Sequence, residues 1–191
     1  MDFIDVYAGE FSEEKMKRAE ELEIKIAPGH FSLLISKNRR EVRKKRKDVD
    51  FVAAIVNKRQ ELNSLLTDVY YDFFIIPSTL RLGKRSVRMA KRYETGIAVP
   101  LSPAFSLKPK LLARISHNLK LVEEIGAILL LCSGAETPED LRSGRDLACI
   151  GVLLGLSPDY ARKAVRHFPN FILERNRERK KQAAWGVEVI Q

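Results

Sequence analysis

Short apolar runs alternate with charged segments along most of the chain, and this alternation constrains the fold more than any other feature. The clearest runs are DFVAAIV (50–56), DFFIIP (72–77), TGIAVPL (95–101) and AILLLC (127–132). They are continuous, as in strands that are buried on both faces, rather than alternating between apolar and polar residues. A segment with helical periodicity follows each run, and the unit repeats about every 25 residues. This pattern predicts parallel strands covered by helices.

Seven or so such units are too many for a comfortable open sheet and few for a full barrel. We therefore predict an α/β protein with a TIM-barrel-like (β/α) barrel that is compact or incomplete and has mainly parallel strands. A doubly wound sheet is the alternative. The chain shows no linker, repeat or low-complexity segment, so we expect one domain over residues 1–191, with the basic segment 174–191 as a candidate flexible end.

Several element boundaries can be predicted from capping residues. Ser12 is expected to cap a helix over 12–23, Ser36 a helix over 37–47, and Ser157 a helix over 157–167 that has Pro158 in its first turn. Gly126 is expected to end the helix over 111–126. We predict a helix over 138–155 whose first turn breaks near Ser143. We also predict a last, separate helix over 170–181 and a final strand over 186–190.

The balance of charges points to a polyanionic partner. The 191 residues include 34 Lys and Arg against 25 Asp and Glu, which gives a net charge of +9. The competing explanation is a surface rich in Lys, Arg and Glu, as in proteins from thermophiles, but such surfaces tend to carry balanced numbers of positive and negative charges. A membrane surface fits less well, because no basic helix carries large apolar residues on its other face. We therefore expect a nucleic-acid partner. The N-terminus lacks the pattern of a signal peptide and no apolar run is long enough to span a membrane, so we expect a cytoplasmic protein.

Catalytic patterns are not evident in the sequence. The chain has no HxH, HExxH, GxSxG, GxGxxG or Walker motif. His30 follows a predicted strand and is more simply a capping or exposed histidine than a ligand. Glu136 and Asp140 allow an acid–base pair, but helix capping explains them better. Cys132 and Cys149 have no metal-ligand spacing and are expected to be buried apolar residues. We predict no catalytic or metal site.

Basic residues cluster instead. Eight of the eleven residues at 37–47 are Lys or Arg, and a solvated helix face or a phosphate-binding face explains them about equally well. Further groups lie at 81–92, at 108–114, at 142–145 and at 175–181. Three of these groups follow successive predicted strands, so they are expected to converge on one rim of the barrel. The RNA-contacting residues we predict are Arg81, Arg85, Lys110, Arg114, Arg142 and Arg145.

The C-terminal half resembles a known family. A strand ending in Ser133-Gly134-Ala135 is followed by an acidic turn over 136–140, then by Arg142, Arg145-Asp146-Leu147 and an apolar helix that ends in Gly155-Leu156. These motifs, within residues 96–176, resemble those of archaeal ribonuclease P protein component 3, a relative of the thirty-kilodalton protein subunit of eukaryotic ribonuclease P. The order of elements fits over essentially the whole chain.

The resemblance implies a TIM-barrel-like subunit of the ribonucleoprotein that removes the 5′ leader from precursor tRNA. It implies ribonuclease P RNA, protein component 2 and other ribonuclease P proteins as partners, with precursor tRNA bound through the holoenzyme. No cofactor would be held by this chain, and magnesium would act at the RNA subunit. Related metal-dependent phosphoesterases carry His-x-His on the first strand, where this chain has Ile4-Asp5-Val6-Tyr7. A metal-dependent phosphoesterase or stand-alone nuclease is the alternative, and a small-molecule barrel enzyme would leave the charge unexplained.

Overall fold

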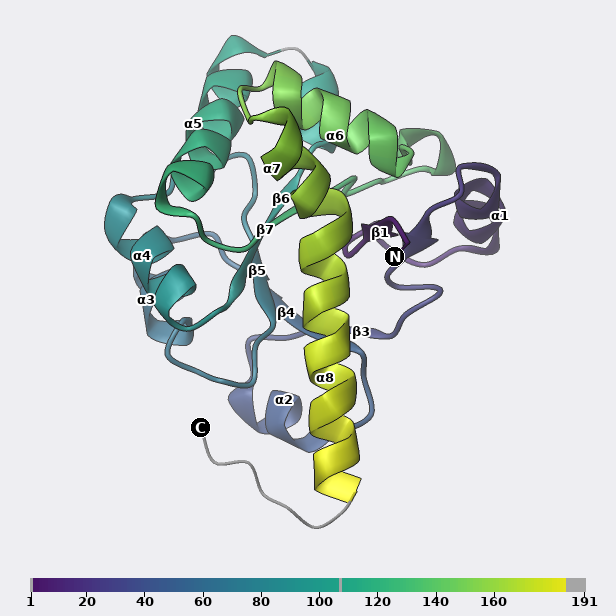
Figure 1. Ribbon diagram of the computed structural model, residues 1–191, viewed down its shortest axis with the longest axis vertical. Coiled ribbons are helices and arrows are strands. Elements are labelled where there is room, and N and C mark those ends of the chain that lie inside the picture. Colours follow the sequence, from purple (N-terminus) through teal and green to yellow (C-terminus); the bar gives the residue numbers. More distant parts are fainter. Residues whose placement is uncertain (1, 107, 185–191) are drawn as a thin grey trace.

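All of the strands run parallel, and five of them form one sheet in the order in which they occur along the chain (Figure 1). The computed structural model describes residues 2–106 and 108–184. The sheet consists of β3 (Leu33–Ile35), β4 (Phe51–Ile55), β5 (Phe73–Ile75), β6 (Gly96–Pro100) and β7 (Leu129–Cys132). A separate parallel pair is made by β1 (Ile4–Asp5) and β2 (Lys25–Ile26). The strand order never reverses, as a doubly wound sheet would require, so the TIM-barrel-like prediction is confirmed and the barrel is not closed.

A helix follows nearly every strand, as the repeating unit predicts. The helices are α1 (Glu13–Glu21), α2 (Arg39–Lys45), α3 (Arg59–Leu65), α4 (Lys84–Arg92), α5 (Pro109–Ile125), α6 (Gly144–Leu153), α7 (Pro158–Arg162) and α8 (Phe168–Ala184). Ser12 accepts a hydrogen bond from the backbone N–H of Lys15, and Gly126 ends α5 with a φ of 71°, both as predicted.

Alternate residues of the buried strands enter two different apolar clusters. Phe51 and Phe73 lie on the inner face with Ile172 of α8, whereas Val52 and Phe74 pack outward against the surrounding helices. Figure 1 shows α8 crossing in front of the strands, with α3, α4 and α5 on one side and α1 on the other. One helix therefore covers the inner face of the incomplete barrel.

Two helix boundaries differ from the sequence-based expectation. The cap of α2 is Asn38, whose Oδ1 accepts from the N–H of Arg40 at 3.1 Å, and the predicted cap Ser36 instead donates its hydroxyl to Glu41 at 2.7 Å. Helix α7 continues through a π-helical turn over Lys163–His167 directly into α8, so the two segments are not separate. Pro169 has no N–H to donate, and a widened turn just before it accommodates that loss.

The structure describes only part of the C-terminal segment for which predictions were made. The basic segment that begins at residue 174 starts inside α8, which runs to Ala184, and Lys180 pairs with Asp50 at 3.2 Å. The predicted strand over 186–190 lies outside the described residues. Within the parts that the structure describes, no helix is long and apolar enough to cross a bilayer.

Candidate nucleic-acid interface at the strand ends

The loops that follow β5, β6 and β7, together with the N-terminal turns of the helices after them, carry the predicted RNA-contacting residues at one edge of the sheet. Because parallel strands end at the same edge, helices α4, α5 and α6 all begin there. Arg85, Lys110 and Arg145 each occupy the second position of one of these helices. All three side chains are exposed, and the structure records no hydrogen bond or ion pair for them among the described residues.

This placement is electrostatically unfavourable for the isolated chain. A helix N-terminus carries partial positive charge, so a cation in the first turn is repelled rather than stabilised. Ser143 caps α6 by accepting from the N–H of Asp146 at 3.1 Å, so the N–H groups of Gly144 and Arg145, in the first turn, have no acceptor within the helix. A phosphate oxygen at this edge would meet both a guanidinium and helix N–H donors.

Two of the predicted arginines hold the loops in place. Arg114 donates to the carbonyl oxygens of Ser78 at 3.3 Å and Thr79 at 2.9 Å, which ties α5 to the loop after β5. Arg142 donates to the carbonyls of Glu139 and Leu141, and its guanidinium lies 4.6 Å from the centre of the Phe105 ring. Phe105 belongs to the loop after β6, so Arg142 links the loops that follow β6 and β7.

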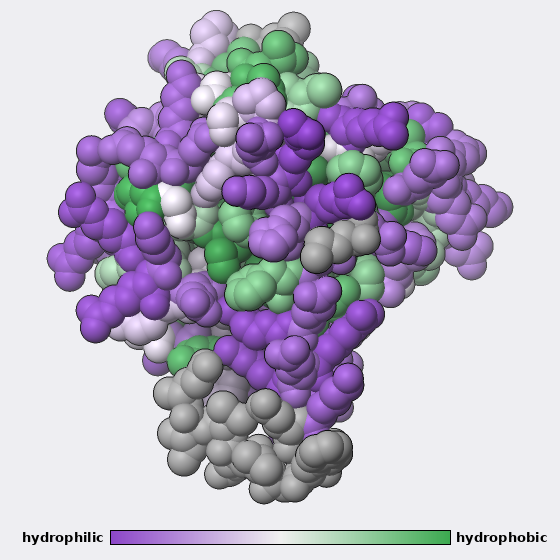
Figure 2. Space-filling model, in the orientation of Figure 1, coloured by the Kyte–Doolittle hydropathy of each residue, from purple (hydrophilic) through white to green (hydrophobic). Residues whose placement is uncertain are grey.

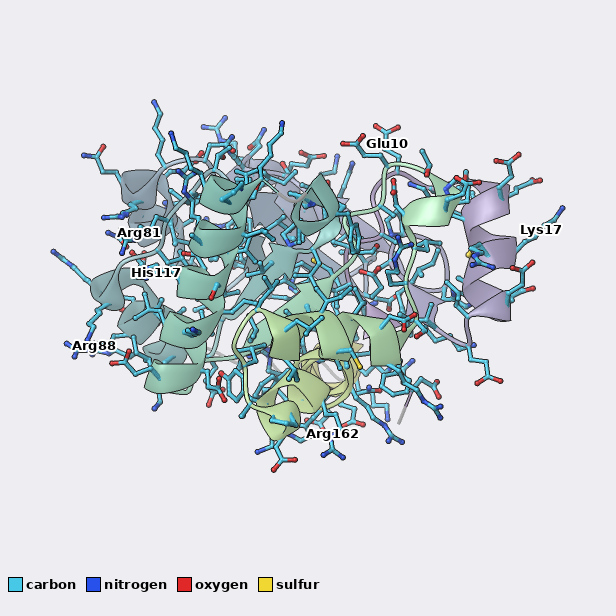
Figure 3. All side chains as sticks on the ribbon, turned by 90° about the horizontal axis from the view of Figure 1, so that it is seen from above. Glu10, Lys17, Arg81, Arg88, His117 and Arg162 are labelled. Carbon is cyan, nitrogen blue, oxygen red and sulfur yellow. The ribbon has the colours of Figure 1, made fainter. Side chains whose placement is uncertain are left out.

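Arg81 occupies the loop between β5 and α4. Its Nη2 lies 3.4 Å from Nδ1 of His117, whose Nε2 lies 3.3 Å from the carbonyl of Leu82, and Figure 3 shows the two side chains next to each other. The Arg81 carbonyl accepts from Nε of Arg59 at 2.6 Å. The side chain of Arg81 is exposed, so its guanidinium retains donors that face solvent.

Buried polar residues that the sequence analysis missed fix the backbone of these loops. Asn118 accepts from the N–H of Leu82 and donates to the carbonyl of Leu80, both at 2.8 Å. It stands beside Leu119 and Ile115 on the apolar face of α5, and a polar residue on such a face is the signal that would have revealed it. The neighbouring loop geometry therefore depends on an amide inside the core.

Lys15 makes the corresponding connection between the first and last strands. Its ammonium group donates to the carbonyls of Ala8 at 3.2 Å, Glu10 at 3.0 Å and Ala135 at 2.8 Å, and the residue is only 4% exposed. The one feature of the sequence that could have indicated its burial is that Lys15 lies four residues before Ala19, and therefore on the same buried face of α1. Lys15 thus holds the loop after β1 against the loop after β7.

The buried residue Asp5 also connects β1 to the end of β7. Its carboxylate accepts from the N–H of Ser133 at 3.0 Å and of Tyr7 at 3.1 Å. Burial raises the pKa of Asp5, and these hydrogen bonds oppose the rise.

The two cysteines differ in burial. Burial together with the nearby Asp5 raises the pKa of the Cys132 thiol well above its ordinary value, so Cys132 is the buried thiol that we predicted. Cys149, in contrast, is exposed on α6, and its predicted burial is wrong.

Comparison with known proteins shows the family of this chain. The profile of the RNase P subunit p30 family matches residues 30–181, which is most of the chain. This chain belongs to the RNase P subunit p30 family. Ribonuclease P protein component 3 of Methanosarcina acetivorans is 31% identical over 86 residues, and that of Methanosarcina mazei is 30% identical over 104 residues. The aligned regions span 36% and 44% of the length of these two relatives.

A solved structure has the same fold as this p30-family chain. It is described as a cryo-EM structure of archaeal ribonuclease P with mature tRNA, and one of its chains superposes with a TM-score of 0.68 at 17% identity. The superposition covers 97% of this chain and 87% of the other. At that identity the similarity supports the fold and leaves the function to be argued from the site.

Two of the residues considered for catalysis, His30 and Asp140, have structural partners in this p30-family chain, whereas Glu136 is exposed. Nδ1 of His30 accepts from the N–H of Ile26 at 3.2 Å, and burial lowers its pKa. Asp140 accepts from the N–H of Thr137 at 3.0 Å in a capping box, and that bond lowers the pKa of Asp140. Across residues 2–106 and 108–184, His, Cys, Asp and Glu form no group of three suited to a metal ion.

Proposed function

We propose that this chain is an RNA-binding protein subunit of ribonuclease P, the ribonucleoprotein that removes the 5′ leader from precursor tRNA. In this proposal the chain binds and stabilises the RNA subunit and a partner protein, protein component 2, beside the other ribonuclease P proteins. It acts in the cytoplasm and is not itself catalytic. The RNA subunit performs the cleavage with magnesium. Membership of the RNase P subunit p30 family supports this proposal.

The observation that carries the proposal is the repeated placement of a cation at the start of three consecutive helices. Arg85, Lys110 and Arg145 stand in equivalent positions of α4, α5 and α6 at one edge of the sheet. Helix stability disfavours each of these placements, whereas a phosphate backbone running along the edge would offset the repulsion and release counterions. Arg81, Arg114 and Arg142 complete the proposed contacting set.

The contacts we propose differ in kind between these residues. Arg114 and Arg142 already use part of their guanidinium groups to hold loop carbonyls, so they present the remaining donors in a fixed direction. Arg85, Lys110 and Arg145 are free to reorient toward phosphate oxygens. We therefore expect substitution of Arg114 or Arg142 to weaken both folding and RNA binding. Substitution of Arg85, Lys110 or Arg145 should weaken RNA binding alone.

A variant of Arg145 tests the role of this edge. Arg145→Ala should leave the unfolding transition unchanged, because the side chain is exposed and has no recorded partner within residues 2–106 and 108–184. It should reduce RNA affinity several-fold, and the slope of log K against log salt should become shallower by about 0.7–0.9, the value for one lost phosphate contact. Loss of folded protein would show that Arg145 has a structural role instead.

Reconstitution separates this proposal from the alternative of a metal-dependent phosphoesterase or stand-alone nuclease. Ribonuclease P RNA would be assembled with the other protein subunits, with and without this chain, and cleavage of precursor tRNA would be measured. The chain should raise the activity of the assembled particle, and by itself should not cleave precursor tRNA in magnesium. Cleavage by the isolated chain would overturn the proposal and favour the alternative.

A further inference from the structure

Most of the excess positive charge of the chain lies away from the strand-end loops. Residues 39–50 and 174–181 together contain 12 of the 34 basic residues and only 5 of the 25 acidic ones. These two segments therefore account for seven of the nine net positive charges, and the rest of the chain has 22 basic residues against 20 acidic ones. An excess so concentrated indicates a surface, not a general property of the protein.

The fold brings these two segments together. Nη2 of Arg46, just after α2, donates to Oδ1 of Asn176 on α8 at 2.7 Å, and Nδ2 of Asn176 donates to the carbonyl of Asp50 at 2.9 Å. Lys180 pairs with the Asp50 carboxylate at 3.2 Å. Figure 1 shows α2 beside the lower half of α8, at the opposite end of the view from α6. Two segments about 130 residues apart in sequence thus form one rigid face.

The cations of this face divide into an engaged set and a free set. Arg46 and Arg175 lie 2.7 and 3.7 Å from the buried carboxylate of Asp72, and Lys45 pairs with Glu41 at 3.0 Å. The cations that are exposed and have no recorded partner among the described residues are Arg40, Lys44 and Lys47 near α2 and Arg177 and Lys181 on α8. We call these five residues the α2–α8 surface.

The spacing of the free cations places them side by side. Arg40 and Lys44 are four residues apart on one face of α2, and Lys47 follows in the turn after the helix. Arg177 and Lys181 are four residues apart on one face of α8. Like charges at these spacings repel one another, and the structure records no ion pair between these five cations and an acidic side chain among the described residues. In Figure 2 hydrophilic residues lie along the visible lower part of α8.

We propose that the α2–α8 surface is a second binding surface for the phosphate backbone of structured RNA, separate from the strand-end loops. This inference rests on the proposed function, and it adds a second place on the chain at which the RNA is bound. A protein partner of ordinary composition would offer no comparable density of negative charge. An anionic membrane would require exposed apolar residues between the cations, but Val42, the apolar residue of α2, is buried.

Three matched variants test the proposal, each removing three cations from the full-length chain. The first is Arg40→Gln/Lys44→Gln/Lys47→Gln on the α2–α8 surface. The second is Arg85→Gln/Lys110→Gln/Arg145→Gln at the strand-end loops. The control is Lys17→Gln/Lys25→Gln/Lys163→Gln, whose residues are exposed and lie on α1, on β2 and in the turn before α8. Figure 3 shows Lys17 directed outward on α1, away from the labelled Arg81.

The measurement is the affinity for a ribonuclease P RNA transcript across a salt series. The first variant should lose at least tenfold in affinity at 100 mM salt relative to the control. Its log–log slope should become shallower by about 2.1–2.7, since each of the three lost phosphate contacts contributes about 0.7–0.9. Arg177→Gln/Lys181→Gln should produce a smaller loss in the same direction. This pair provides an independent measurement should the triple variant fold poorly.

The outcomes distinguish this inference from the proposed function. If the α2–α8 variants behave like the control while the strand-end variant binds weakly, the second surface is disproved and the proposed function stands. If the wild-type chain shows no salt-dependent RNA binding, both are disproved. Tighter binding of the wild-type chain to phosphatidylserine vesicles than to the transcript would identify the surface as membrane-directed and would also overturn the inference.

Discussion

At the scale of single residues, a buried cation joins the two ends of the incomplete barrel. The ammonium of Lys15 is surrounded by three carbonyl oxygens, two from the loop after β1 and one from the loop after β7. No β-ladder joins β1 to β7 among the described strands, so the connection depends on Lys15, on Asp5 and on a backbone bond from Gly134 to Tyr7 at 2.9 Å. Lysine is rarely buried to this degree unless its charge is satisfied.

Replacing this lysine tests its role. Lys15→Met keeps much of the apolar stem but removes the donor from the buried carbonyls of Ala8 and Ala135 and from the partly buried carbonyl of Glu10, so the free energy of unfolding should fall by about 3 kcal/mol. Lys17→Met, an exposed change on the same helix, should alter it by less than about 0.5 kcal/mol. Urea denaturation of both variants measures the difference. Equal stability of the two variants would contradict the role assigned to Lys15.

At the scale of elements, the acidic turn before α6 has a capping function that depends on pH. The hydrogen bond from the N–H of Thr137 lowers the pKa of Asp140, so the folded state favours the charged carboxylate more than the unfolded state does. The resulting stabilisation is fully present above the unfolded-state pKa of about 4 and is lost as the pH falls through the lower folded-state pKa.

The pH dependence can be measured with Asp140→Asn, which keeps the shape of the turn and removes its charge. At pH 7 the variant should be less stable by about 0.5 kcal/mol, a typical value for an exposed acid in a first helical turn. The difference should shrink as the pH falls below about 4 and through the lowered folded-state pKa, because the wild-type carboxylate then becomes protonated. Chemical denaturation at each pH measures the difference in free energy of unfolding between the wild type and Asp140→Asn. A difference that stays constant or grows on acidification would refute this assignment.

At the scale of the whole molecule, α8 stabilises the barrel by covering its inner face. Ile172 is fully buried among the inward residues of the strands, and the polar residues of the same helix contact the N-terminal ends of β4, β5 and β6 through Asp50, Asp72 and Glu94. A single helix therefore contacts residues from most of the chain. Its removal from the core should affect all strands together.

Truncating that contact should destabilise the protein cooperatively. Ile172→Ala deletes buried methyl groups and should lower the free energy of unfolding by about 3 kcal/mol. Glu174→Ala, an exposed change in the same helix, should lower it by less than about 0.5 kcal/mol. Hydrogen exchange in β4, β5 and β6 should accelerate by the same factor in Ile172→Ala. Faster exchange limited to α8 would show that the helix packs as an independent unit.

Much of the site was predictable at low resolution and little of it in detail. Continuous apolar runs located the strands, and parallel topology then placed the cations after β5, β6 and β7 at one edge. The sequence did not separate Arg114 and Arg142, which hold carbonyls, from Arg85, Lys110 and Arg145, which are exposed. That distinction depends on which carbonyls lie within reach of each side chain, and this follows only from packing of the loops.

The sequence by itself determined the parallel β/α class, the strand-end placement of the first set of cations and the resemblance to the ribonuclease P protein family, because apolar periodicity, chain order and local motifs are properties of neighbouring residues. Tertiary structure decided the open barrel, the cover formed by α8, the burial of Lys15, Asp5 and Asn118, and the union of α2 with α8. These features depend on contacts between residues more than 100 positions apart or on partners found only after packing. Local patterns carry no information about such contacts.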